Sequence, residues 1–168
     1  MQKEFDSSRL ATVSYGLIHD LLRALEKVCS AHELDAILTA SGIPSGGDQS
    51  RSRLSREQIV RLYKVAAEVT GDEMMGLWSR PIRTGALKQI CASMLGASSL
   101  GAGVFRMVTF WNLVLDDYQL EVNSQDEVVT LSLVQRMPNP VNRFGHMLML
   151  KLIHGLASWL ALQELPVE

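Results

Sequence analysis

Residues 84–115, TGALKQICASMLGASSLGAGVFRMVTFWNLVL, are the stretch that decides the fold. They predict two apolar helices in tandem, separated by a joint of small residues at Gly96–Ser99. The only charged side chains in the stretch are Lys88 and Arg106, and its second half contains Trp111. A segment this apolar is expected inside a protein rather than on its surface. We therefore expect the two helices to form the central layer of the fold.

The composition is that of one globular domain. The chain has 168 residues, of which 47% are hydrophobic and 20% charged, and its formal net charge is −2. This length favours a single core, and the slight negative charge argues against a dedicated nucleic-acid-binding protein. No signal segment or membrane-spanning run is evident, so we expect a cytoplasmic chain without membrane contact. Cys29 and Cys91 are expected as reduced, buried thiols.

Apolar residues at helical spacing predict helices over about residues 13–30, 33–41 and 55–70, with a loop at residues 43–52. Gly42 is expected to end the second helix, and Ser55 with Gln58 to form a capping box on the third. The first two helices have the spacing of a helix-turn-helix. The second of them carries no Arg or Lys, so two packed bundle helices explain the pattern better than a DNA reader.

Two segments after the central stretch alternate apolar and polar residues, at residues 118–122 and 128–134. The polar residues between them favour a turn, so the sequence predicts a β-hairpin. A last helix is predicted over about residues 141–162. The expected fold class is α+β, mainly helical with a small antiparallel β-hairpin. We expect residues 1–10 to be disordered and residues 11–168 to form the domain.

No catalytic signature is present, so we expect a protein that is not an enzyme and has no catalytic residues. The glycines at 96, 101 and 103 lack the strand and lysine of a nucleotide-binding loop, and we interpret them as a close joint between packed helices. His146 and His154 lie eight residues apart on one helix, too far to share a metal without further ligands. We therefore expect no metal and no cofactor.

Aromatic and methionine side chains gather between residues 74 and 111. Such a cluster is explained either by simple core packing or by a small-molecule cavity. In the second case Arg80, Arg83 or Arg106 would supply a positive charge to a carboxylate ligand. The candidate ligand-binding residues are Trp78, Arg80, Phe105, Arg106 and Trp111.

Several short motifs occur in a characteristic order. They are Met75-Gly76-Leu77-Trp78, then Arg83-Thr84-Gly85, then Ser99-Leu100-Gly101-Ala102-Gly103-Val104, and finally Thr109-Phe110-Trp111-Asn112-Leu113-Val114. With the hairpin and long helix that follow, this order resembles the N-terminal effector-binding domain, of the arabinose-binding type, of AraC/XylS transcription regulators. Where the family has Glu, this chain has Ala102, followed by Gly103 inside a helix, which predicts a softer helix start.

The resemblance implies a ligand-sensing regulatory domain that binds a small-molecule effector and controls dimerisation or an attached DNA-binding domain. In the family, further strands and paired helix-turn-helix motifs follow, whereas this chain stops at Glu168. We therefore expect contact with DNA only through an absent C-terminal domain. A homodimer is expected, with Trp159 and Leu160 as its contact. The alternative is a stand-alone helical protein-interaction module without a small-molecule ligand.

Overall fold

The computed structural model describes residues 12–45, 53–125, 128–137 and 143–167. The chain folds into a mainly helical α+β structure, as predicted. The expected disorder of residues 1–10 and most of the expected loop lie outside the described residues. In chain order the elements are β1 (Thr12–Ser14), α1 (Tyr15–Val28), α2 (Ala31–Ala40), β2 (Arg53–Ser55), α3 (Arg56–Thr70), α4 (Ala86–Leu95), α5 (Leu100–Val114), β3 (Tyr118–Gln125), β4 (Val128–Gln135) and α6 (Arg143–Leu160).

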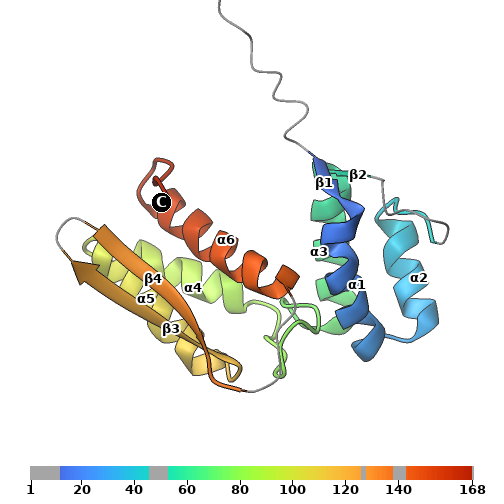
Figure 1. Ribbon diagram of the computed structural model, residues 1–168, viewed down its shortest axis with the longest axis horizontal. Helices are drawn as coiled ribbons and strands as arrows, with labels where there is room; N and C mark the ends of the chain where they lie inside the picture. The colour runs from blue at the N-terminus through green and yellow to red at the C-terminus, as the bar shows by residue number, and fades with distance from the viewer. Residues whose placement is uncertain (1–11, 46–52, 126–127, 138–142, 168) are drawn as a thin grey trace, which may run out of the picture.

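The elements form two groups that share one core. Helices α1, α2 and α3 gather at one end, and α4, α5, α6 and the β3–β4 hairpin gather at the other (Figure 1). Between them runs the segment at residues 71–85, which we call the connecting loop. Helix α1 packs against α6, which joins the two groups directly.

Helix ends follow the capping signals of the sequence. Gly42 has φ +67° directly after the C-cap of α2, as expected of a terminating glycine. Ser55 and Gln58 exchange both bonds of the predicted capping box at the start of α3. A second capping box, Ser30 with Glu33, begins α2 and was missed, although its Ser-x-x-Glu spacing is readable in the sequence.

One strand pair was not predicted. Residues 12–14, of which Val13 and Ser14 were expected at the start of the first helix, are extended and pair antiparallel with β2, with Val13 opposite Leu54. Arg53 fixes this pair because its guanidinium donates to the Thr12 hydroxyl and carbonyl. Three-residue strands are too short to show a period of two in sequence, so only the tertiary contact reveals them.

The two tandem helices and their joint are present as α4 and α5, but the expectation that they lie wholly inside is wrong. Helix α5 buries Met107 and Trp111, whereas Phe105 and Leu113 are 70% and 71% exposed. The reason is that α5 packs on α4, α6 and β3, which leaves its remaining face outward. The central position belongs instead to the connecting loop and the first turns of α6.

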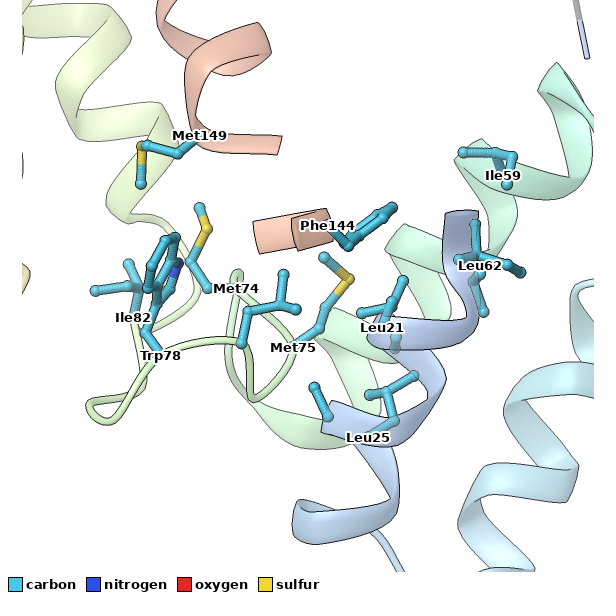
Figure 2. Close-up of a cluster of buried hydrophobic side chains, with 14 of the residues drawn as sticks. Leu21, Leu25, Ile59, Leu62, Met74, Met75, Trp78, Ile82, Phe144 and Met149 are labelled. Atoms are coloured by element: carbon cyan, nitrogen blue, oxygen red, sulfur yellow. The ribbon is translucent and has the colours of Figure 1, made fainter. Parts of the chain in front are cut away.

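The core where the two groups meet is shown in Figure 2. Leu21 and Leu25 of α1, with Leu62 of α3, approach this region from one side. Met74, Met75, Trp78 and Ile82 enter from the connecting loop, and Phe144 and Met149 enter from α6. All of these side chains are buried. The methionine-rich cluster noted in the sequence is thus, in large part, the packing that joins the halves of the fold.

The predicted hairpin is present and longer than expected, with β3 and β4 paired along eight residues each. Tyr118 and Leu120 are buried, and Leu131 and Leu133 pack partly against the core. Among the described residues this sheet has two strands only. Asn112 of α5 fastens it to the helices, because its side-chain amide donates to the Leu120 carbonyl at 2.9 Å and accepts from the Leu120 N–H at 2.7 Å.

Two further expectations need correction. Cys29 and Cys91 are free, but both are half-buried rather than fully buried. The glycines of residues 96–103 were expected to bring the two tandem helices together. Gly96 does so, because a Cβ there would meet Nη1 of Arg106 on α5 at 3.4 Å. Gly103 instead lies mainly against Leu160 of α6, while Gly101 has no neighbour close to where a side chain would begin. Across the described ranges, no helix combines the length and apolar character needed to cross a membrane.

Candidate functional site

The connecting loop is organised by a buried aspartate. Asp72, 4% exposed, accepts hydrogen bonds from three backbone N–H groups, those of Met74, Gly76 and Ile82, at 2.8–2.9 Å. The Met74 and Ile82 bonds share one carboxylate oxygen, so the two ends of the loop are tied to one side chain. Charge-assisted bonds of this kind are stronger than neutral ones and favour one loop conformation.

Two other carboxylates fix the loop to its neighbours. Glu73 accepts from the N–H groups of Gly85 and Leu87, at 2.7 and 2.8 Å, and so holds the N-terminus of α4. Asp117, at the start of the hairpin and 4% exposed, accepts from both the N–H and the hydroxyl of Ser79. The loop is therefore hydrogen-bonded directly to the start of α4 and to the residue that precedes β3.

Aromatic rings connect the loop, the hairpin and α6. The ring of Trp78 meets Tyr118 edge-on, with centroids 5.3 Å apart, and Tyr118 meets His146 in the same way at 4.9 Å. Edge-to-face pairs of this geometry contribute about 0.5–1.5 kcal/mol beyond area burial. Trp111 pairs likewise with its neighbour Phe110, at 5.3 Å.

Both buried tryptophans carry an unsatisfied donor. The indole N–H groups of Trp78 and Trp111 have no acceptor among the described residues, although their side chains are only 6% and 0% exposed. An unpaired buried donor costs about 1–3 kcal/mol, so such groups are unusual in a packed core. Each indole N–H would be stabilised by an acceptor oxygen placed within hydrogen-bond distance.

A surface depression of about 470 Å³ lies where the connecting loop meets α4 and α5. Its lining is mostly apolar and carries two guanidinium groups; the residues are Arg80, Pro81, Ile82, Arg83, Ala86, Phe110 and Val114. Arg80 lies 3.7 Å from Asp116, and both side chains are more than half exposed. An ion pair this exposed contributes little to stability, so Arg80 can exchange its partner at small cost.

The five candidate residues are not brought into one site. Arg80 lines the depression, Trp78 and Trp111 lie in the core, and Phe105 projects from α5. Arg106 donates to the Ser93 carbonyl at 2.7 Å and so ties α5 to α4.

The depression also includes residues that were not singled out, notably Ile82 and Val114. The four-residue spacing of Phe110 and Val114 on one helix was the sequence signal that could have identified Val114.

In the described part of the chain, no three side chains of metal-ligating type come close enough to hold an ion.

Comparison with known protein families gives a match over most of the chain. A family described as the arabinose-binding domain of AraC transcription regulators, N-terminal, matches residues 32–168, well over half of the chain. No curated protein and no solved structure matches it.

Proposed function

We propose that this chain, which belongs to the family of N-terminal arabinose-binding domains of AraC transcription regulators, senses a small-molecule effector and passes the signal to dimerisation or to an attached DNA-binding domain. Family membership is the observation that carries this proposal. The candidate residues Trp78, Arg80, Phe105, Arg106 and Trp111 remain part of it.

The depression supports a small amphipathic carboxylate as the effector. Its lining is mostly apolar and includes the side chains of Arg80 and Arg83. A guanidinium pairs with a carboxylate through two parallel hydrogen bonds, and the ring of Phe110 offers an apolar surface for the rest of the ligand. Arg80 would exchange its exposed partner Asp116 for the ligand. Because the side chains of Arg80 and Asp116 are both more than half exposed, this exchange leaves no buried charge without a partner.

The connecting loop supports a route for the signal. Arg80 follows directly after Ser79, which is bonded to Asp117 of the hairpin, and Glu73 of the same loop holds α4. A ligand that draws Arg80 inward would therefore favour one arrangement of loop, helix and hairpin over another. Differential binding of this kind shifts the population between two states.

The test is tryptophan fluorescence in a Trp159→Phe background, which leaves Trp78 and Trp111 as the reporters. Benzoate is the probe, benzamide is its uncharged match, and arabinose represents the sugar in the family description. Benzoate should change the emission in a saturable way and benzamide should bind more weakly. Arg80→Gln should weaken benzoate binding about tenfold, whereas Arg56→Gln, on α3, should leave it unchanged.

The alternative function, a helical protein-interaction module without a small-molecule ligand, draws support from the outward face of α5. Phe105 and Leu113 are each about 70% exposed on that face, and exposed apolar groups of this size mark interaction surfaces when they are contiguous. Emission that stays constant with all three probes would contradict the sensor proposal and favour this alternative.

A further inference from the structure

The carboxylates near the connecting loop are of two kinds. Asp72, Glu73 and Asp117 each accept a hydrogen bond from a backbone N–H, so each already holds part of the fold. Asp116 makes no such bond within the described residues, and its partner there is the guanidinium of Arg80, at 3.7 Å. Asp116 is therefore the carboxylate in this region that a ligand can engage without breaking a hydrogen bond to the backbone.

The two arginines that line the depression differ as well. Arg80 is separated from Asp116 by more than the length of a hydrogen bond. Arg83 is exposed, and its side chain makes no ion pair in the described part of the chain. The backbone of Arg83 is nevertheless fixed, because its carbonyl accepts from the Ala86 N–H at 3.1 Å. The depression thus presents one cation that has an anion nearby and one that does not.

These charges set a condition on the ligand. A carboxylate that takes Arg80 leaves Asp116 without a cation, and the next residue, Asp117, is also acidic. Neighbouring negative charges repel each other, although water and salt weaken the repulsion at an exposed position. A ligand with only a negative charge therefore gains one ion pair and removes another. A ligand with both charges pairs with Arg80 and Asp116 at the same time.

We propose that the depression binds an α-amino acid with an apolar side chain. The carboxylate of the ligand pairs with Arg80, and Arg83 adds a second positive charge to the lining. The ammonium group of the ligand pairs with Asp116. In an α-amino acid both charged groups are attached to one carbon atom, so they suit a guanidinium and a carboxylate that lie 3.7 Å apart.

The apolar part of the ligand also has a matching surface. Ile82, Phe110 and Val114 belong to the lining, and the volume of about 470 Å³ is within the range of small-molecule sites. The inference rests on the proposed function, because it names the ligand class of the same depression. It adds a role for Asp116, which lies near Arg80 rather than in the lining.

The test is the tryptophan emission of the full chain in the Trp159→Phe background, titrated with three matched probes. Phenylalanine carries both charges, 3-phenylpropionate lacks the ammonium group, and 2-phenylethylamine lacks the carboxylate. All three share the ring and the carbon chain that bears it, so differences between them report the charges. We expect phenylalanine to bind about tenfold more tightly than either of the others.

Two substitutions separate the contributions of the charged groups. Asp116→Asn keeps the shape of the side chain and removes its charge, so it should weaken phenylalanine binding about tenfold without weakening that of 3-phenylpropionate. Arg80→Gln should weaken the binding of both. Glu121→Gln, the control, removes an exposed carboxylate of β3 that does not line the depression, and it should weaken neither. Circular dichroism checks that each variant is folded.

Leucine and 4-methylpentanoate repeat the comparison with an aliphatic side chain. Carboxylates that bind as tightly as the matching amino acids, with no effect of Asp116→Asn, would overturn the amino-acid ligand and leave the carboxylate sensor standing. Binding of 2-phenylethylamine as tight as that of phenylalanine would overturn it as well. Emission that stays constant with both amino acids, both matching carboxylates and benzoate would overturn the proposed function together with this inference.

Discussion

Leu160 of α6 fills the space that a side chain at position 103 of α5 would need. A Cβ built on Gly103 overlaps Cδ2 of Leu160. Glycine inside a helix costs about 1 kcal/mol relative to alanine, and here that cost permits the close approach of two helices. The residue that the sequence predicts to soften the start of α5 therefore also allows Leu160 to pack closely against α5.

A double-mutant cycle measures this relationship. Gly103→Ala alone should not stabilise the protein, because the gain in helix propensity is offset by the overlap with Leu160. In a Leu160→Ala background the same change should stabilise it by about 1 kcal/mol. Gly101→Ala, on the same helix with open space around it, is the control and should stabilise in both backgrounds. Equal effects of Gly103→Ala with and without Leu160, measured by urea unfolding, would contradict the packing role.

Asp72→Asn should destabilise the fold by about 2 kcal/mol. The amide has one acceptor oxygen where the carboxylate has two, so a buried backbone N–H of Met74, Gly76 or Ile82 loses its partner. Asp116→Asn removes a charge that is 55% exposed and should change the free energy of unfolding by less than about 0.5 kcal/mol. Chemical denaturation of both variants gives the comparison, and similar values for the two would rule out the organising role of Asp72.

Gly76→Ala should cost more than Gly71→Ala. Both glycines have positive φ, +73° and +65°, so alanine is strained at either position by about 1–2 kcal/mol. Only at Gly76 would a Cβ also meet the Val28 side chain, at 2.8 Å, and the Ala24 carbonyl, at 3.2 Å. The difference in thermal stability between the two variants therefore isolates the contact between the connecting loop and α1. We expect the two substitutions to differ by at least about 1 kcal/mol in their effect on the free energy of unfolding.

Burial raises the pKa of Tyr63 to about 12, and its ring meets Phe144 edge-on with centroids 6.2 Å apart. In the unfolded chain a tyrosine ionises near pH ~10. Between these values the unfolded chain releases a proton that the folded chain keeps, so stability is intact below pH ~10 and falls as the pH rises toward 12. Tyr63→Phe should reduce this fall in the free energy of unfolding between pH ~10 and ~12, as measured by chemical denaturation at a series of pH values. An unchanged slope would count against this assignment.

The sequence by itself determined the elements whose signals are local. Ser55, Gln58 and Gly42 mark helix ends through bonds or backbone angles confined to a few neighbouring residues, and the hairpin shows its period of two over adjacent positions. The family match over residues 32–168 confirms the resemblance drawn from motif order.

Only the tertiary structure decided which apolar faces are covered and where the candidate site residues lie. Trp78 and Phe105 have the same apolar character in sequence, yet one is buried against Tyr118 and the other is exposed. The missed β1–β2 pair and the Gly103–Leu160 contact join residues 39 or more positions apart. A local pattern sets the periodicity of apolar residues in a helix or strand. Burial depends instead on which distant element packs on each face, because apolar surface is removed from water only by a neighbour that covers it.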